Sequence, residues 1–211
     1  IGPFVIIEAG VTNGQGNQFK ANSYVCTGTT MGNGNQVHMG AVLGNEPQDV
    51  GFKGEPSYTV IGNNNIFREY STVHRGTEAG TSTIIGNRCF LMESAHVAHN
   101  CILGDEVIMI NKASAAGHVE IQDGALISGG SVIHQFCRVG RRAIMSGLTG
   151  INQDVPPFAN VGGRRGVVYG LNVVGLRRAG IAQPQRTALQ NAYKLIFRSD
   201  LLLSEAMAEL S

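Results

Sequence analysis

The stretch "IGNRCFLMESAHVAHNCILGDEVIM", residues 85–109, places an aliphatic residue at every sixth position. The spacing continues to Ile151 without a gap. In a chain with 43% hydrophobic residues, twelve matches in one register arise by chance with a probability on the order of 10⁻⁵. The aliphatic positions are Ile85, Leu91, Val97, Leu103, Met109, Ala115, Ile121, Ile127, Ile133, Val139, Met145 and Ile151.

This repeat of six residues predicts a parallel β-helix. A period of six fits neither the 3.6-residue turn of an α-helix nor simple strand alternation. Three hexads make a coil of about 18 residues, and neighbouring coils stack at about 4.8 Å. The aliphatic residue and a small residue at the fifth position, such as Ala95, fill a narrow interior. The 29 glycines and the low aromatic content, 6%, suit the tight corners of such a solenoid.

We expect the solenoid to occupy residues 1–157. Turn-forming residues replace the repeat near 45–60 and 76–84, which predicts two excursions from the coils. The repeat ends at Pro156 and Pro157, because two adjacent prolines remove two donors from the strand ladder.

The C-terminal part of the chain predicts helices. Residues 158–182 form a connecting segment, and residues 183–211 form a helical region in which apolar residues recur at helical spacing. A second helix is expected to begin near Ser204. The chain starts without methionine at Ile1 and stops early in that helix, so we expect residues to be missing at both ends.

Composition excludes several classes of protein. The 16 Lys and Arg residues balance 15 Asp and Glu residues, which argues against nucleic-acid and membrane-surface partners. No apolar run reaches the roughly 18 residues that span a bilayer. Cys89, Cys101 and Cys137 occupy the small inward position, whereas Cys26 is expected to point outward. Without paired short spacings the cysteines predict neither a disulfide framework nor a zinc ribbon, and a reducing, cytoplasmic compartment is expected.

The histidines do not follow the core pattern. None of the six occupies an aliphatic or small position of the repeat. Because a coil has 18 residues, His99 should lie beside Gly117 on the next coil, and Gly117 beside Gln135. We therefore expect His99, His118 and His134 to line one edge of the solenoid. The complete set is His38, His74, His96, His99, His118 and His134.

The pair in "HVAH" has two chemical interpretations. Residues three apart on a strand face opposite sides, so His96 and His99 do not form a zinc site of the helical type. A zinc site that combines histidines from two subunits, as in β-helix carbonic anhydrases, remains an alternative. A catalytic base is favoured, since imidazole, with a pKa of about 6.5, can take a hydroxyl proton near neutral pH.

Eight segments resemble one family of hexapeptide-repeat enzymes, the acyl-ACP:UDP-N-acetylglucosamine 3-O-acyltransferases of lipid A biosynthesis. The similarity covers nearly the whole chain in order, including the C-terminal helix. The segments are "QDVGFKGEP" (48–56), "IFREYSTVHRGT" (66–77), "SAHVAHNCILG" (94–104), "AAGHVEI" (115–121), "VIHQFCRVG" (132–140), "QDVPPF" (153–158), "GLNVVGLRRAG" (170–180) and "NAYKLIFRS" (191–199).

The resemblance implies a left-handed β-helix and a cytoplasmic homotrimer with active sites in the clefts between subunits. It implies the first step of lipid A biosynthesis, in which a (hydroxy)acyl chain passes from acyl carrier protein to a UDP-sugar without a cofactor or a metal. The second histidine of the A-H-x-A-H motif, His99, would be the general base, and the backbone N–H of Gly117 would stabilise the oxyanion.

The resemblance also assigns substrate contacts. Gly147 matches the position that limits acyl-chain length, and glycine there would leave room for a longer chain. Asn172 and Arg178 would bind the nucleotide, His134 and Gln135 the substrate or the phosphopantetheine arm. The residues that would line the sugar and acyl region are Asp49, His74, His96 and His118.

Four positions depart from the family pattern. Asn100 replaces the aspartate that usually follows the catalytic histidine, and Gly51 replaces a common lysine. The acid expected near Val174 is absent, and Gly163 is followed by Arg164 instead of asparagine. These changes leave two alternatives open: an N-acyltransferase acting on a 3-amino sugar nucleotide, and an inactive solenoid that only binds. A zinc-dependent lyase of the carbonic anhydrase type remains a separate alternative, from the histidine pair.

Overall fold

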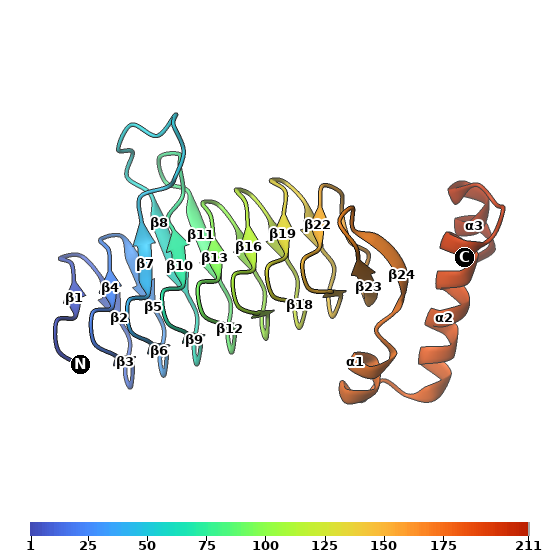
Figure 1. Cartoon of the computed structure of the whole chain (residues 1–211), viewed down its shortest axis with the longest axis horizontal. Coiled ribbons are helices and arrows are strands. Elements are labelled where there is room, and N and C mark those ends of the chain that lie inside the picture. The colour runs from blue at the N-terminus through green and yellow to red at the C-terminus, as the bar shows by residue number, and fades with distance from the viewer. Residues whose placement is uncertain (211) are drawn as a thin grey trace.

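The hexad repeat folds into three parallel sheets that run along the molecule, as the computed structural model shows for residues 1–210 (Figure 1). Together they form a left-handed β-helix. The first sheet contains β1 (Ile6–Ile7), β4 (Tyr24–Val25), β7 (Val42–Asn45), β10 (Thr72–His74), β13 (His96–Val97), β16 (Ser114–Ala115), β19 (Val132–Ile133) and β22 (Gly150–Ile151).

The other two sheets complete each coil. The second contains β2 (Thr12–Asn13), β5 (Thr29–Met31), β8 (Tyr58–Ile61), β11 (Ser82–Ile85), β14 (Ile102–Leu103), β17 (Glu120–Ile121) and β20 (Arg138–Val139). The third contains β3 (Gln18–Phe19), β6 (Gln36–Val37), β9 (Ile66–Phe67), β12 (Phe90–Leu91), β15 (Ile108–Met109), β18 (Leu126–Ile127), β21 (Ile144–Met145), β23 (Ala159–Gly162) and β24 (Val167–Leu171).

The strand register confirms the 18-residue coil. Val97 pairs with Ala115, and Ala115 pairs with Ile133. The aliphatic and small positions point inward: Leu91, Val97 and Ala95 are fully buried. An interior this narrow gives each outward residue a fixed neighbour one coil away, which is how the fold positions a site.

Three corners connect the sheets within each coil. Corner 1 joins the first sheet to the second, corner 2 the second to the third, and corner 3 the third to the first. At corner 1, Asn100, His118 and Phe136 occupy equivalent places on successive coils, each in the left-handed conformation with φ near +60° (58°, 60° and 66°). Asparagine and histidine are among the residues that tolerate this region best. These three residues therefore stack in one column along the edge.

Both predicted excursions are confirmed, and they cover part of the first sheet. They leave the solenoid after β7 and β10 and project from the same edge (Figure 1). They change two expectations: His74, expected to be outward and accessible, is only 4% exposed, and Cys26, also expected outward, is 5% exposed. The end of β7 and the segment after it explain both, because Cys26 Sγ contacts the side-chain oxygen of Asn45 and Glu46 reaches His74 through its backbone.

Parallel stacking continues past the two prolines. β23 pairs with β21 as a further rung of the third sheet, and β24 then returns antiparallel to β23. The solenoid is therefore longer than the predicted 1–157, because Pro156 and Pro157 lie in the corner before β23 and not in a strand.

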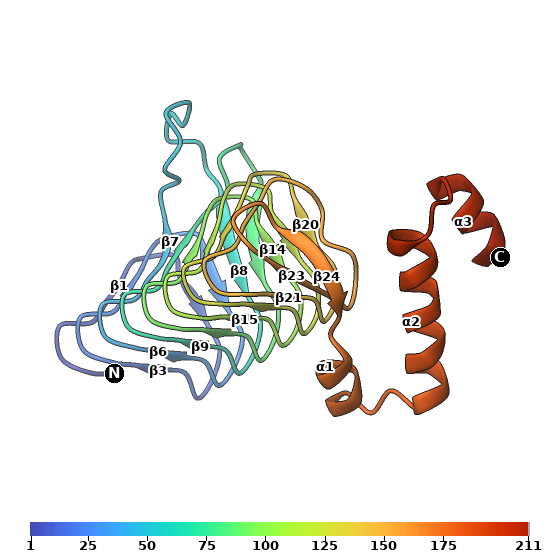
Figure 2. The ribbon, with the colours of Figure 1, turned by 45° about the vertical axis from the view of Figure 1, so that its right-hand side comes forward.

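Three helices follow: α1 (Val173–Arg178), α2 (Gln183–Arg198) and α3 (Leu203–Leu210). The predicted second helix of the C-terminal region is confirmed, one residue earlier than expected. Figure 2 shows α2 and α3 beyond the end of the solenoid. Hydrogen bonds from Tyr193 and Arg198 of α2 to the backbone of β24 connect the helical region to the solenoid. None of the helices in residues 1–210 has the length and hydrophobicity needed to cross a membrane.

Candidate active site

His99 lies at corner 1 with its ring held from one side. The side chain is 13% exposed, and its Nδ1 lies 3.0 Å from the side-chain oxygen of Asn100. That oxygen also accepts hydrogen bonds from the backbone N–H of Thr77, at 3.0 Å, and from its hydroxyl, at 2.9 Å. Thr77, in the second excursion, thus holds the side chain of Asn100, and Asn100 in turn orients the ring of His99.

These contacts determine the tautomer of His99. A backbone N–H can only donate, so the atom of Asn100 that faces Thr77 is the amide oxygen. This oxygen can only accept, so Nδ1 of His99 carries the proton and donates it. Nε2 is left with a free lone pair, as a general base requires. Asn100 therefore orients the ring where an aspartate would otherwise do so, without adding a negative charge.

The predicted proximity of Gly117 and His99 is confirmed. A Cβ atom at position 117 would lie 2.5 Å from Nε2 of His99, which is closer than real Cβ atoms come to a neighbour. Among the described residues the backbone N–H of Gly117 has no acceptor. Glycine thus leaves space in front of the free nitrogen and an unused donor beside it.

The expected ladder of three histidines is wrong at its third position. The rings of His99 and His118 make an edge-to-face contact at 5.2 Å, but the next ring is Phe136, stacked on His118 at 4.8 Å. The reason is the 18-residue coil, which places position 136 next to 118. His134 lies two positions earlier on the same coil, next to Ala116, and is exposed.

The first excursion brings a carboxylate to the site. Asp49 Oδ2 lies 3.8 Å from Nε2 of His99, and Asp49 Oδ1 accepts a hydrogen bond of 2.7 Å from the N–H of Gly51. A cavity of about 560 Å³ opens in front of His99. It is lined by Gln48, Asp49, Val50, His96, Ala98, His99, Ser114, Ala115, Ala116, Gly117, Val132, Ile133 and Gln135. The sequence placed several of these residues far apart, and the solenoid assembles them.

His96 lines the inner end of this site, and His74 is buried beside it. Nδ1 of His96 lies 2.8 Å from the hydroxyl of Thr72, its neighbour one coil below. The rings of His74 and His96 meet edge to face at 5.1 Å. Burial, with a further contribution from His96, lowers the pKa of His74 to about 4. Burial also lowers the pKa of His96. Both imidazoles are therefore neutral at physiological pH, and His96, which lines the cavity, can contact an uncharged sugar or acyl group.

The buried His74 predicts a pH-dependent stability. The unfolded chain takes up a proton at this residue near pH 6.5, the folded chain only near pH 4. Between these values the unfolded state binds more protons, so the free energy of unfolding falls as the pH falls, by about 1–3 kcal/mol. Urea unfolding at pH 7, 5.5 and 4.5, at constant protein concentration, should show a smaller fall for His74→Gln than for the unchanged protein. Equal pH dependence in the two proteins would contradict this assignment.

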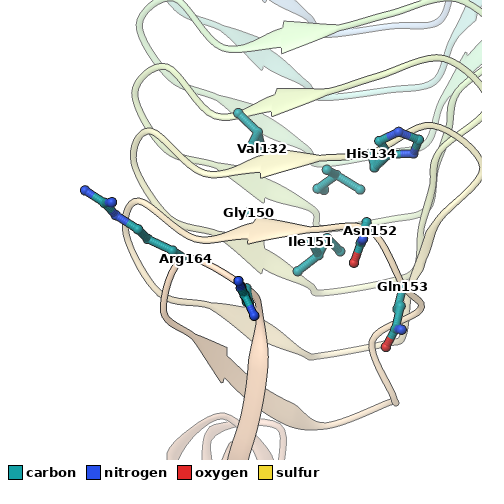
Figure 3. A pocket seen from close by; sticks show the side chains of 9 residues that line it. Val132, His134, Gly150, Ile151, Asn152, Gln153 and Arg164 are labelled. Atoms are coloured by element: carbon teal, nitrogen blue, oxygen red, sulfur yellow. The ribbon is translucent and has the colours of Figure 1, made fainter.

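Of the remaining predicted site residues, Gln135 lines the cavity of His99 and His134 lines a neighbouring cavity (Figure 3). The other three lie outside these two cavities. Gly147 lies at corner 3, where a Cβ atom would make an ordinary contact of 3.5 Å with the oxygen of Gly129. Asn172 caps α1 through Gly175 and donates to the backbone oxygen of Arg142, at corner 2. Arg178, at the end of α1, is exposed.

A single chain therefore does not bring Asn172 and Arg178, the residues expected to bind the nucleotide, close to His99. α1 lies across the solenoid from the edge that carries the two excursions (Figure 1). The amide of Asn172 is 6% exposed, and both its oxygen and its nitrogen already have backbone partners. Its contribution within this chain is to fix the start of α1.

Two residues of the site were missed by the sequence analysis. Thr77 ends the motif "HRGT" but lies in an excursion, and nothing in the repeat predicts that it reaches Asn100. Phe136 follows from the coil arithmetic, because it is two coils after Asn100, and this signal was available. Within residues 1–210 no three His, Cys, Asp or Glu side chains come close enough to hold a metal ion.

Comparison with known proteins gives the family context. Residues 154–211 match the family model described as UDP-N-acetylglucosamine O-acyltransferase, domain 2. The chain is 47% identical over 182 residues to the acyl-[acyl-carrier-protein]–UDP-N-acetylglucosamine O-acyltransferase of Synechocystis, an alignment that covers 86% of this chain and 66% of the relative. The corresponding enzyme of Anaeromyxobacter is 44% identical, with coverage of 86% and 71%.

Solved structures agree over almost the full chain. LpxA from Acinetobacter baumannii superposes with a TM-score of 0.95 at 37% identity, covering 99% of this chain and 81% of that one. The UDP-N-acetylglucosamine acyltransferase of Francisella novicida gives 0.96 at 34% identity, with coverage of 99% and 77%. The sequence identity, the fold and the motifs of the chain all match these enzymes. The chain therefore belongs to the family of acyl-[acyl-carrier-protein]–UDP-N-acetylglucosamine O-acyltransferases.

Proposed function

We propose that the protein transfers a (hydroxy)acyl chain from acyl carrier protein to the 3-position of UDP-N-acetylglucosamine, the first step of lipid A biosynthesis, in the cytoplasm. The observation that carries the proposal is the arrangement of His99, whose Nδ1 donates to Asn100 while Nε2 faces an open cavity beside Gly117. The family relationship supports the choice of substrates.

The geometry suits a direct transfer. Nε2 of His99 takes the proton of the sugar 3-hydroxyl as its oxygen attacks the thioester carbonyl carbon. The N–H of Gly117 donates to the carbonyl oxygen as it becomes negative, which is the charge that an oxyanion donor stabilises. The carbon–sulfur bond then breaks, and the leaving thiolate receives the proton from the imidazolium. The acyl donor is itself a substrate, so the proposal includes no cofactor.

The cysteines support a mechanism without an acyl-enzyme. Burial raises the pKa of Cys101 to about 12 and that of Cys89 to about 11, so neither thiol forms the thiolate that a nucleophile needs. The buried Cys26 has a pKa raised to about 11 for the same reason. Cys137 is also buried, with a raised pKa.

We infer that the working enzyme is a homotrimer. Asn172 and Arg178 lie across the solenoid from His99, so a nucleotide bound at His99 can meet Arg178 only from a neighbouring subunit. An arginine is suited to a diphosphate by its charge and its fork of donors. This arrangement makes the site incomplete in a single chain.

The decisive experiment is a product assay. Purified protein is incubated with a panel of acyl carrier proteins that differ in acyl length, and with UDP-N-acetylglucosamine or its 3-amino analogue. Mass spectrometry should detect the 3-O-acyl sugar nucleotide. Product from the 3-amino acceptor alone would assign an N-acyltransferase, and binding without any product would assign an inactive solenoid.

Asn100→Asp should move the acid side of the pH–rate profile. A carboxylate accepts the same hydrogen bond but also stabilises the imidazolium form of His99. The variant's base is therefore protonated at a higher pH, and activity is lost at a higher pH on acidification. We expect the acid limb of kcat/KM to shift to higher pH by about one unit. Asn191→Asp, an isosteric change on the exposed face of α2, should leave the profile in place. An unshifted acid limb in Asn100→Asp would show that Asn100 does not contact the base during turnover.

A further inference from the structure

Arg75 is a buried arginine that the proposed mechanism does not use. It follows β10 directly, at the start of the second excursion, and its side chain is only 12% exposed. Among residues 1–210 its one ion-pair partner is Glu46, at 3.3 Å, whose side chain is 67% exposed. The Nε of Arg75 is buried without a hydrogen-bond partner. A buried N–H without an acceptor is unfavourable, so a further contact must hold this side chain in place.

That further contact is the ring of Phe52, in the first excursion. Cζ of Arg75 lies over the ring, 5.5 Å from its centroid, a distance at which a guanidinium is attracted to an aromatic face. The backbone N–H of Arg75 also donates to the oxygen of Asn45, at 2.9 Å. Arg75 therefore holds the first excursion at two places, at Asn45 and Glu46 where the chain leaves β7, and at Phe52 six residues later.

Asp49 lies between these two places, in a hydrogen-bonded turn. The N–H of Phe52 donates to the backbone oxygen of Asp49, at 3.1 Å, and the N–H of Gly51 donates to Oδ1 of the same residue. The ring of Phe52 and the carboxylate of Asp49 thus belong to one turn, so a shift of the ring moves the carboxylate. The other carboxylate oxygen, Oδ2, is the one that lies 3.8 Å from Nε2 of His99.

This turn has few other ties to the solenoid. Within the part of the chain that the structure describes, no hydrogen bond joins residues 47–55 to the rest. The two excursions project from the same edge (Figure 1), and residues of both line a hollow of about 430 Å³. Apart from the approach of Asp49 to His99, the contact of Phe52 with Arg75 is therefore the electrostatic tie that fixes the turn. The hollow is lined by Asp49, Gly51, Phe52, Glu55, Thr77, Glu78 and Ala79.

We propose that Arg75 is a positioning residue, which sets the carboxylate of Asp49 beside Nε2 of His99 by holding the turn through Phe52. The inference rests on the proposed function and adds to it the residue that fixes one wall of the acceptor site. The carboxylate and Nε2 are both acceptors, so the donor that fits beside them is a hydroxyl of the sugar. Arg75 itself lines neither the cavity of His99 nor the hollow, so it acts through Asp49.

The kinetic test follows the acceptor and the donor separately. In Arg75→Gln the kcat/KM for UDP-N-acetylglucosamine should fall about 10-fold, because a displaced carboxylate misplaces the sugar. The KM for acylated acyl carrier protein should stay within about twofold. Phe52→Leu keeps an apolar side chain but removes the ring, so it should give the same loss. Arg88→Gln removes an exposed arginine with acidic neighbours at corner 2 and should change neither value.

A rise of the donor KM equal to the acceptor loss would indicate general damage to the site and contradict the proposal. Arg75→Lys keeps a positive charge that can lie over the ring, and it should retain part of the activity that Arg75→Gln loses. If Arg75→Gln does not fold, Phe52→Leu and Arg75→Lys carry the same comparison. Equal losses in Arg75→Lys and Arg75→Gln would count against the contact with the ring.

A double variant tests whether Arg75 acts through Asp49. Asp49→Ala removes the carboxylate, so its position no longer matters. Adding Arg75→Gln to Asp49→Ala should therefore change kcat/KM for the sugar nucleotide by less than about twofold. A further 10-fold loss in the double variant would show that Arg75 acts by another route, and would overturn the assignment.

Hydrogen exchange separates this inference from the proposed function, because it needs no turnover. Deuterium uptake is followed by mass spectrometry in peptides that cover residues 46–56. Uptake should be about 3- to 10-fold faster in Arg75→Gln and in Phe52→Leu, since the turn opens more often, and unchanged in Arg88→Gln. Faster uptake in a protein that makes no product would uphold the contact that holds Asp49 and reject the proposed function. Product formation with unchanged uptake and unchanged kinetics in these variants would reject the inference alone, and faster uptake without a kinetic loss would reject the positioning role.

Discussion

Replacing His99 by alanine should lower kcat about 10³-fold while the protein still folds and assembles. General-base catalysis contributes typically ~10²–10⁴ in rate, and the ring of His99 is held so that Nε2 alone is free to accept a proton. The side chain is not part of the interior, so stability should change little. The measurement is single-turnover kinetics with saturating acyl carrier protein and sugar nucleotide.

Two comparisons make this result specific. His38→Ala is the control. His38 contacts Glu69 and lies at corner 3, whereas His99 lies at corner 1, so this variant should keep normal turnover. Added imidazole should restore part of the activity of His99→Ala, because the space beside Gly117 is then open to a free base. Near-normal turnover of His99→Ala would reject the base and leave Asp49, 3.8 Å away, as the group to examine.

The solenoid could be predicted from sequence because its repeat is local. One inward residue in each hexad sets the coil at 18 residues, and from this number alone Gly117 was placed beside His99. The same arithmetic places Phe136 beside His118. The prediction that His99, His118 and His134 line one edge did not use it and named His134 as the third residue. Where backbone register decides a contact, sequence is sufficient.

The excursions could not be predicted in the same way. They have no repeat, so nothing in the sequence states that Thr77 fixes the amide of Asn100 or that Asp49 returns to His99. The burial of His74 has the same origin, since its position in the hexad is outward and a segment from outside the coil covers it. Asn172 shows a further limit: a motif identified the residue, but only the structure shows that both ends of its amide cap and anchor α1.

Gly117→Ala should lower kcat/KM about 10²-fold without unfolding the protein. The backbone at this position is not in the left-handed region, so alanine is compatible with the main chain. The added Cβ would lie 2.5 Å from Nε2 of His99 and 3.1 Å from Nδ1, so the ring must move away from Asn100 and from the reacting hydroxyl. A misplacement of about 1 Å can cost ~10²-fold in rate. Gly170→Ala, where a Cβ atom would meet nothing within 4 Å, is the matched control and should behave normally.

A double variant distinguishes the two roles assigned to Gly117. Alanine keeps the backbone N–H, so an effect of Gly117→Ala reports on the close approach to His99 and not on loss of the oxyanion donor. Once His99 is already alanine there is no ring to displace, and adding Gly117→Ala should change the residual rate by less than about twofold. A further 10²-fold loss in the double variant would mean that the methyl group blocks the substrate itself. In that case the space in front of Gly117 belongs to the thioester carbonyl, and the base would be positioned independently of this glycine.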